Sequence, residues 1–586
     1  MSNTLKKISA ILMSVIMIVA MTVSSVMAGS HNLEAKPAAT DTETVTVKGL
    51  KSGDKVTFYQ IVKAEYGETG FEGYVINDKH SSASLTGKDS NNNEVVIYPS
   101  AEQLSELAKT PADIKFSGEA AAKFVDVAPN ENGTVEQVLA AGEWLAVVTP
   151  ADAKDIYNPM VVSVYYEENG SKITSGSVTA SDSYSINGTT SYVKSSSTNV
   201  DKKITGGKAN NYNNYNEEGA KSGTVDRTIA SDSNNNGDDL AIGDSIDFEI
   251  TSTIPAYSTE YVNPVFNVYD LMDAGLTLDK DSIKVYVGGT EVPTEKVAET
   301  YSIDKNGGEG YTFKVNFLQS YIESADVRTA TAEARAVKVT YSATLNEKAK
   351  TNFDYNKNTA TVEFTNKPGD NQKAEKITDE TYQYTFEIDG SIGGNDKTRT
   401  HRTHELIKTG EGGSVVDGAI VDDGWSETTV TSPLADAVFT LTNNTTGKVY
   451  TATTDATGYM NFKGLDAGTY TLQETQAPDG YSLNSQKHTV KIEAFYNENG
   501  TLKSYSIEID GKNTSTYEAT YDSTNKDNIT EIHEKAVQST EIKNTKLNQL
   551  PSTGGIGTYL FTIIGVAIMA AAAAALSASR KRKVVK

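Results

Sequence analysis

Short segments in which apolar and polar residues alternate recur along most of the chain. They are rich in Val, Thr, Tyr and Ile, and turns rich in Gly, Asn, Asp and Ser separate them. Examples are residues 44–48, 55–62, 160–166, 245–254, 282–287, 312–317, 336–345, 435–442 and 469–474. A period of two is typical of strands that bury one face. Helical patterns are limited to short candidates at residues 101–109 and 118–125, so the chain is predicted to be all-β.

The strand pattern is interrupted at two places. A Ser-, Thr- and Asn-rich stretch covers residues 174–199, and Gly and charged residues break the pattern at 390–402. Such stretches are typical of domain boundaries, and a chain of 586 residues has the length of three to four domains. We therefore predict tandem Ig-like β-sandwich domains; their expected ranges are residues 29–197, 198–395 and 396–547.

The N-terminus has the layout of a secretory signal. Lys6 and Lys7 precede an apolar run at residues 8–23, and Val26 and Ala28 are small residues at the positions that a signal peptidase reads. We predict that residues 1–28 are a cleaved signal peptide. An N-terminal anchor helix is the alternative, which the short apolar run disfavours.

The C-terminus combines an apolar run at residues 559–576 with a basic tail at 577–586. A run of this length predicts a transmembrane helix, and the basic tail is predicted to stay cytoplasmic. Five residues that precede the run match the LPxTG pattern: Leu550, Pro551, Ser552, Thr553 and Gly554. In this context the motif resembles the cell-wall sorting signal that sortase transpeptidases read in Gram-positive bacteria.

That resemblance implies a defined reaction at Thr553. A sortase thiolate would attack the Thr553 carbonyl, expel the chain from Gly554 onward and pass the acyl group to an incoming amine. The protein would then be exported and bound covalently to peptidoglycan after a transient stay in the membrane. A plain membrane-anchored protein is the alternative.

Composition removes several classes of function. The chain has no cysteine, which excludes disulfides, thiolate metal sites and a cysteine nucleophile. Its net charge of −24 argues against a nucleic-acid partner, because binding phosphates requires a basic face. No phosphate loop and no Ser/His/Asp constellation is present, so we expect neither a conventional enzyme nor a cofactor.

The third predicted domain carries the clearest motif. A segment "LIK" ends at Lys408, a segment "ETQAPDGY" begins at Glu474, and "EIKN" ends at Asn544. The set resembles the collagen-binding-protein B-type domain of Gram-positive surface proteins. In that family a lysine of the first strand and an asparagine of the last strand join covalently with the help of the glutamate. The resemblance therefore implies an isopeptide bond between Lys408 and Asn544 that Glu474 promotes.

The middle predicted domain has a comparable triple. It opens with "VDKKI", contains "VYDLMDAGLT" and ends near "NTATV", which resembles the fimbrial isopeptide-forming domain. The resemblance assigns Lys202 and Asn358 to the bond and Asp270 to the promoting acid. Lys203 competes with Lys202, which we prefer because it shares strand parity with the apolar Ile204.

The expected chemistry explains the residue types. A lysine ammonium cannot attack a carbonyl, but burial disfavours charge, so it lowers the pKa of the amine and raises that of the carboxylic acid. The neutral amine then attacks the asparagine carboxamide, and the protonated acid stabilises the oxyanion and moves protons to the departing ammonia. First and last strands are expected to supply the pair because they are sheet neighbours. The alternative is that these are solvated lysines and turn residues.

A polymer would also need an exposed lysine as acceptor. Backbone pilins assembled by sortases usually carry a "VxVYPK" motif at the end of the first domain. The corresponding strand here, residues 160–166, is followed by Glu167 in place of that lysine. We predict Lys194, which lies shortly before Lys202, with Lys172 as the second candidate.

Two weaker motifs are set aside. Residues 232–237 begin like a calcium loop at Asp232, but Gly243 replaces the bidentate glutamate, so a polar turn is preferred and no metal is expected. The string from His401 to Glu405 fits neither HExxH nor HxxEH.

Taken together, the resemblances imply the major subunit of a covalent surface pilus. Its expected partners are sortases of the pilin and housekeeping classes, further copies of itself, peptidoglycan, minor pilins and a host or bacterial surface ligand. Two alternatives stay open: a monomeric wall-anchored adhesin, and a surface hydrolase with a site in residues 29–197.

Overall fold

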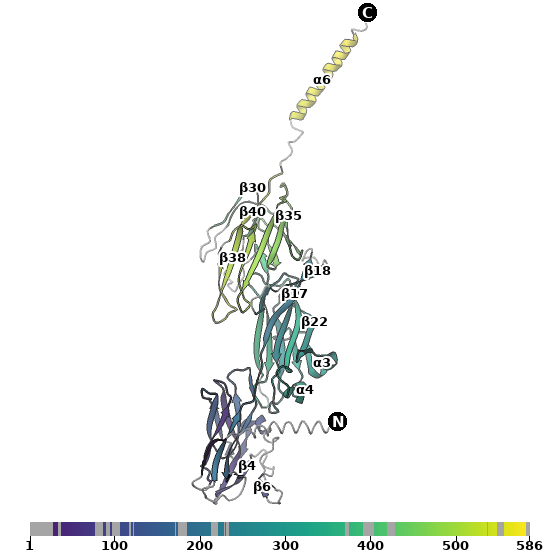
Figure 1. The fold of residues 1–586 in the computed structure, drawn as a ribbon. Coiled ribbons are helices and arrows are strands. Elements are labelled where there is room, and N and C mark those ends of the chain that lie inside the picture. The colour runs from purple at the N-terminus through teal and green to yellow at the C-terminus, as the bar shows by residue number, and fades with distance from the viewer. Residues whose placement is uncertain are drawn as a thin grey trace.

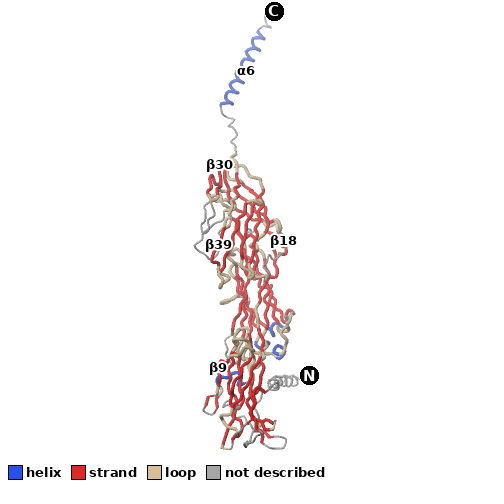
Figure 2. The backbone as a smooth tube through the Cα atoms, turned by 60° about the vertical axis from the view of Figure 1, so that its left-hand side comes forward, coloured by secondary structure: helices blue, strands red, loops and turns tan. Residues whose placement is uncertain are grey.

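The computed structural model describes most of the chain between its termini. The described residues are 27–32, 37–68, 70–76, 86–88, 94–96, 106–116, 119–120, 122–169, 171–173, 184–212, 221–227, 229, 234–369, 374–390, 404–418, 428–535, 537–547 and 556–581. These residues form three β-rich bodies that follow one another along a long axis (Figure 1). A view turned by 60° shows the same elongated shape (Figure 2). The prediction of an all-β chain is confirmed.

The first body is built around one sheet in the order β10-β2-β15-β13-β11-β3-β4, in which β2 and β15 are parallel. Strand β1 also pairs with β15, β14 with β13 and β9 with β3, and β5–β6, β7–β8 and β12–β16 form small separate pairs. The elements are β1 (Met27–Asn32), β2 (Thr42–Lys48), β3 (Lys55–Gly67), β4 (Gly70–Ile76), β5 (Thr86–Lys88), β6 (Glu94–Val96), η2 (Pro111–Asp113), β7 (Lys115–Phe116), β8 (Glu119–Ala120), β9 (Lys123–Val127), β10 (Thr134–Ala140), β11 (Gly142–Thr149), β12 (Asp155–Tyr157), β13 (Met160–Glu168), β14 (Ser171–Lys172), β15 (Tyr184–Tyr192) and β16 (Ser195–Ser197).

The middle body is a sandwich of two six-stranded sheets. One has the order β18-β17-β20-β26-β22-β23, and the other has the order β19-β28-β27-β21-β25-β24. The elements are β17 (Asp201–Tyr212), β18 (Lys221–Asp226), β19 (Gly237–Asp239), β20 (Ser245–Thr253), β21 (Phe266–Met272), β22 (Leu276–Val287), β23 (Thr290–Glu291), α3 (Thr294–Thr300), β24 (Tyr301–Asp304), β25 (Phe313–Phe317), α4 (Gln319–Ile322), α5 (Ala325–Arg328), β26 (Ala336–Leu345), β27 (Asn356–Phe364) and β28 (Glu375–Tyr384).

The third body contains a seven-stranded sheet in the order β33-β32-β35-β36-β37-β38-β39. The smaller sheet β31-β30-β40 faces it. A two-stranded pair, β29–β34, completes it, so β29 joins this body although it lies inside the range expected for the middle domain. The elements are β29 (Phe386–Ile388), β30 (Leu406–Val416), β31 (Thr429–Pro433), β32 (Val438–Asn443), β33 (Val449–Thr453), β34 (Phe462–Leu465), β35 (Gly468–Gln476), β36 (Lys487–Tyr496), β37 (Leu502–Ile509), β38 (Asn513–Tyr521), β39 (Ile529–Glu534) and β40 (Thr540–Lys543).

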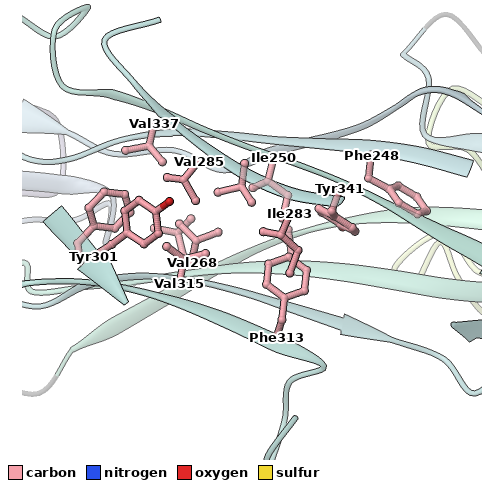
Figure 3. Packing of buried hydrophobic residues seen from close by; sticks show 14 of the residues in the cluster. Phe248, Ile250, Val268, Ile283, Val285, Tyr301, Phe313, Val315, Val337 and Tyr341 are labelled. Carbon is pink, nitrogen blue, oxygen red and sulfur yellow. The ribbon is translucent and has the colours of Figure 1, made fainter. Parts of the chain in front are cut away.

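Each body has its own core, and alternation along the strands produces it. Strand β26 buries every second side chain, from Val337 to Leu345, as a strand with one buried face does. Its inward residues join Val285, Val268 and Val315 between the two sheets of the middle body (Figure 3).

The two junctions between bodies are made differently. At the first–middle junction, the Tyr261 hydroxyl donates to the Tyr157 carbonyl (2.9 Å) and the Asn366 amide donates to the Ala153 carbonyl (3.2 Å). At the middle–third junction, a buried ion pair joins Lys448 Nζ to Asp244 Oδ1 (3.2 Å). Neutral hydrogen bonds thus bridge the first junction, whereas the second includes a buried ion pair.

Two local predictions need comment. Residues 106–109 are helical, within the candidate at 101–109. The candidate at 118–125 is wrong: β8 and β9 lie there instead. Strand β9 pairs with β3, and the Phe124 and Trp144 ring centroids lie 5.7 Å apart. These tertiary contacts override the helix propensity of the alanines.

A C-terminal helix, α6 (Ile556–Lys581), extends beyond the third body (Figure 1). It covers the run at 559–576. Among the helices of the described residues, however, none combines the length and the apolar character that crossing a membrane requires. The prediction of a transmembrane helix is therefore not supported, although the helix itself is present. Residues 1–26 of the predicted signal peptide lie outside the described residues.

Candidate cross-linking sites

The first candidate site lies between the two sheets of the middle body. Lys202 is on β17 of one sheet, and Asp270 on β21 and Asn358 on β27 are on the facing sheet. Because Asp270 pairs with Ala360, Asn358 is its diagonal neighbour on the same face. The side chains of Lys202 and Asp270 and the whole of Asn358 have no solvent exposure (0%).

Polar contacts join the three residues through a fourth, Tyr341 on β26. Lys202 Nζ lies 2.6 Å from Asp270 Oδ2 and also donates to the Tyr341 hydroxyl. The Tyr341 hydroxyl in turn donates to Asp270 Oδ2 (2.5 Å) and accepts a hydrogen bond from Asn358 Nδ2 (3.1 Å). All three predicted residues therefore meet, and the sequence patterns did not single out Tyr341.

Aromatic rings surround the amine. Lys202 Nζ is 4.8 Å from the centroid of the Phe248 ring and 5.0 Å from that of Tyr341. Burial lowers the pKa of Lys202, although the neighbouring Asp270 opposes this, and burial raises the pKa of Asp270, which Lys202 opposes. Both directions favour a neutral amine beside a protonated acid.

The second candidate site lies in the third body, where the parallel strands β30 and β40 are neighbours. Lys408 pairs with Ile542, and the backbone N–H of Asn544 donates to the Thr409 carbonyl (3.0 Å) just beyond the end of β40. Glu474 reaches the pair from β35 of the facing sheet. The Lys408 side chain has no solvent exposure (0%), and those of Glu474 and Asn544 are buried.

These three side chains form a closed triangle of contacts. Lys408 Nζ donates to Asn544 Oδ1 (2.5 Å) and lies 3.0 Å from Glu474 Oε1, which also accepts from Asn544 Nδ2 (2.9 Å). The Asn484 backbone N–H holds the other carboxylate oxygen at 2.7 Å. Burial lowers the pKa of Lys408, an effect that Glu474 opposes, and the Phe439 ring lies 5.4 Å from Nζ.

The two sites correct one expectation about strand placement. Lys408 and Asn544 come from neighbouring strands of one sheet, as expected. In the middle body Lys202 and Asn358 belong to opposite sheets, so a bond there would tie the two layers of the sandwich together. The reason is that β17 pairs with β20 and β18, while β27 pairs with β21 and β28.

The competing lysines differ clearly in their surroundings. The Lys203 side chain is 44% exposed and pairs with Asp201 at 2.8 Å, which raises its pKa. Lys194 is exposed between β15 and β16. Lys172 belongs to β14 at the Glu167–Lys172 pairing, but its side chain is outside the described residues.

The other singled-out segments lie wholly or partly outside the described residues. Residues 550–554 and Asp232 lie outside the described residues. His401 does too, whereas His404 and Glu405 are buried in the third body. Within the described part of the chain, no group of three or more His, Cys, Asp or Glu side chains is arranged to hold a metal ion.

The chain resembles known proteins in two regions and over most of its length. Residues 426–509 match the SpaA family, described as a prealbumin-like fold domain. Residues 542–586 match the LPXTG cell wall anchor motif. The trypsin-resistant surface T6 protein of Streptococcus pyogenes serotype M6 is 25% identical over 574 residues, which cover 90% of this chain and 93% of that protein.

One solved structure shows which fold the chain has. The T6 backbone pilin of serotype M6 Streptococcus pyogenes, which has a modular three-domain structure, aligns with 88% of this chain and 100% of its own, at a TM-score of 0.55 and 20% identity. The full-length major pilin SpaD from Corynebacterium diphtheriae covers 88% of this chain and 100% of its own, at a TM-score of 0.42 and 16% identity. The chain therefore shares the fold of the T6 pilin.

Proposed function

We propose that this chain, a homologue of the T6 protein that carries an LPXTG cell wall anchor, is the major subunit of a covalently polymerised surface pilus. Sortases join Thr553 of one subunit to a lysine of the next, and peptidoglycan receives the last subunit. The contact between copies is head-to-tail and open, which generates a filament. Minor pilins and a host or bacterial surface ligand are its further partners.

Within each subunit, two isopeptide bonds form without another enzyme. In the third body the neutral Lys408 amine attacks Cγ of Asn544, a new C–N bond forms, and the bond to Nδ2 breaks. Nδ2 leaves as ammonia after gaining the proton that the amine loses. Glu474 contacts both nitrogens, which supports the proposal that it carries that proton.

The closed triangle of Lys408, Glu474 and Asn544 is the observation that carries this proposal. A solvated lysine or a turn asparagine, the alternative interpretation, would not be buried with its polar atoms directed at each other. In the middle body Lys202, Asp270 and Asn358 meet the same requirement of burial beside an acid.

The pKa directions also explain why an unreacted site is unfavourable. A lysine whose pKa is lower in the folded than in the unfolded state destabilises the fold at pH values below its unfolded-state pKa. An aspartic acid whose pKa is higher in the folded state destabilises the fold at pH values above its unfolded-state pKa. At neutral pH the unreacted Lys202 and Asp270 therefore both destabilise the fold. Amide formation removes the ionisable amine.

The bond at the third site closes a loop between positions 136 residues apart. In a chain-entropy model, a cross-link over a loop of about 100 residues or more contributes roughly 4–5 kcal/mol. A pilus subunit bears tension along its length, so bonds of this kind suit the proposed role.

Mass spectrometry of the secreted chain tests the proposal. Each bond releases one ammonia, so we expect a deficit of about 17 Da per bond and two joined peptide pairs, Lys202 with Asn358 and Lys408 with Asn544. K202M should remove the first pair only, and the matched control K203M should keep both. A wild-type chain of unshifted mass would contradict the cross-links.

A further inference from the structure

Tyr341 occupies the centre of the middle site. It lies on β26, and its side chain is buried between the two sheets at 2% exposure. Its hydroxyl oxygen contacts Lys202 Nζ, Asp270 Oδ2 and Asn358 Nδ2. Those are the amine, the acid and the leaving nitrogen of the proposed reaction.

The directions of these hydrogen bonds are informative. Both nitrogens donate to the tyrosine oxygen, and the tyrosine proton is directed at Asp270. During amide formation one proton must pass from the attacking nitrogen to the departing one. Tyr341 is therefore the group that touches both the origin and the destination of that proton.

The third site shows why a tyrosine is needed in the middle one. There, Glu474 Oε1 lies within 3.0 Å of both nitrogens and requires no intermediary. Aspartate is one methylene shorter than glutamate, and Asp270 contacts Lys202 while its contact with the Asn358 amide runs through the Tyr341 hydroxyl. Asp270 Oδ1 and Asn358 Oδ1, by contrast, are buried without a hydrogen-bond partner in the described structure.

We propose that Tyr341 is a catalytic residue of the middle site that relays the proton from Lys202 to Asn358, an inference that rests on the proposed cross-linking function. Its oxygen accepts a proton from Nζ as the Nζ–Cγ bond forms, and its own proton passes to Nδ2 as the Cγ–Nδ2 bond breaks. Ammonia leaves and the tyrosine is regenerated. Asp270 keeps its proton and donates a hydrogen bond to the developing oxyanion, so that Oδ1 of each residue gains a partner.

The surroundings suit a neutral relay. Burial and the adjacent Asp270 raise the pKa of Tyr341 well above its usual value, so it does not ionise, and a neutral hydroxyl can both accept and donate. The ring is held by Phe248, stacked at 5.3 Å, and by Phe313 from the facing sheet at 4.9 Å (Figure 3). These contacts would survive a change to phenylalanine.

Y341F in the full chain tests the relay. The chain is made by cell-free synthesis, quenched in denaturant at intervals and digested, and free and joined peptides are counted for both sites. We expect the bond between Lys202 and Asn358 to form roughly a hundredfold more slowly, as general acid–base catalysis would require. The third-body bond should form at the wild-type rate in the same samples.

Two further variants separate catalysis from packing. Y505F removes a buried phenol oxygen of the third body that has no hydrogen-bond partner in the described structure, and it should leave the middle site unchanged. In Y341F/D270E the longer acid should reach both nitrogens and recover much of the rate. The pair K202M and K202M/Y341F, which lack the attacking amine and cannot react, should unfold at similar temperatures.

Each outcome decides between the alternatives. A wild-type rate in Y341F would overturn the relay while leaving the cross-link itself in place. A slow Y341F that D270E does not rescue, together with a K202M/Y341F chain that is less stable than K202M, would assign Tyr341 to packing only. If the wild-type chain forms no bond between Lys202 and Asn358, the proposed cross-link of the middle body fails, and the relay fails with it.

Discussion

The first body and the two that follow differ in where they place their lysines. Among the lysines of the first body whose side chains the structure describes, none is buried. In the other two bodies, Lys202 and Lys408 have no exposure at all. A buried amine is costly unless it is paired or consumed, so this placement separates two kinds of lysine. Lysines such as Lys154 and Lys194 of the first body are exposed to other molecules, whereas Lys202 and Lys408 face partners inside their own fold.

The first body buries charge in another way. Its fully buried Asp54 accepts hydrogen bonds from the Tyr157 hydroxyl (2.7 Å) and from the backbone N–H groups of Lys51 (2.8 Å) and Ala151 (2.9 Å). Lys51, which pairs with Asp155 at 2.6 Å, keeps a side chain that is 60% exposed. These are ordinary non-covalent contacts, so the first body is expected to be the least constrained part of the subunit.

A buried lysine alone does not make a cross-linking site. Lys448 is buried at the middle–third junction, where its Nζ contacts the Asp244 carboxylate and the Ile242 carbonyl. Burial lowers the pKa of Lys448 as well. Lys202 and Lys408 each lie in a cluster of contacts that contains both an acid and the carboxamide of an asparagine, Asn358 or Asn544.

The largest expected effect is the loss of polymer when the exposed Lys194 is replaced. K194A should abolish high-molecular-weight polymer in wall extracts while monomer is still exported, because the acyl group on Thr553 would lose its acceptor. The matched control is K154A: Lys154 is also exposed and lies at the other end of the β12–β16 pair. Polymer that persists in K194A but disappears in K172A would move the acceptor to Lys172.

A smaller effect is expected from removing the acid of the third site. E474Q should prevent the bond between Lys408 and Asn544 and lower the unfolding temperature of the third body by roughly 10–20 °C, as the loss of about 4–5 kcal/mol predicts. Calorimetry of the full chain measures the unfolding temperature, and the mass deficit shows whether the bond has formed. The unfolding of the first body should not change.

Two further variants help to interpret the result for E474Q. E493Q changes an exposed glutamate that pairs with Lys491 at 2.7 Å and should behave as wild type. K408M removes the bond together with the buried amine, so any stability that it regains relative to E474Q reports the cost of an unreacted amine. An E474Q chain that still shows the full mass deficit would contradict the role of Glu474.

The sequence was informative wherever a pattern is local. Alternation along residues 336–345 predicts β26 and places Tyr341 on its inward face, and strand parity favours Lys202 over Lys203. What alternation cannot supply is the partner on another strand. Which inward residue of β26 faces Lys202 depends on how β17, β20 and β26 align, and that is a non-local property.

The same limit explains the errors. The alanine-rich segment at 118–125 has local helix propensity, but its pairing with β3 is a contact between distant positions. The expectation that both lysine–asparagine pairs join sheet neighbours failed for the middle body because sheet membership is decided by the whole topology. Motif resemblance singled out lysines and asparagines that the structure brings together, and the fold shows that a bond in the middle body would link the two sheets, whereas a bond in the third body would join adjacent strands.

The smallest expected effect, and the one that compares the two sites most finely, is on the pH dependence of bond formation. At the middle site, acidification through the lowered pKa of Lys202 protonates the amine, so formation should slow at low pH. A rise in pH through the raised pKa of Asp270 removes the proton of the acid, so formation should slow again. The rate should therefore pass through a maximum between these limits.

At the third site the lowered pKa of Lys408 predicts the same slowing on the acidic side. Full-length chain made by cell-free synthesis, and transferred to buffers of different pH before quenching, gives both rates from one digest. D270E should shift the alkaline limb of the middle site and leave the third site as it was. A middle-site rate that does not vary with pH would mean that neither the protonation of Lys202 nor that of Asp270 affects the reaction. The description of the site as a neutral amine beside a protonated acid would then be wrong.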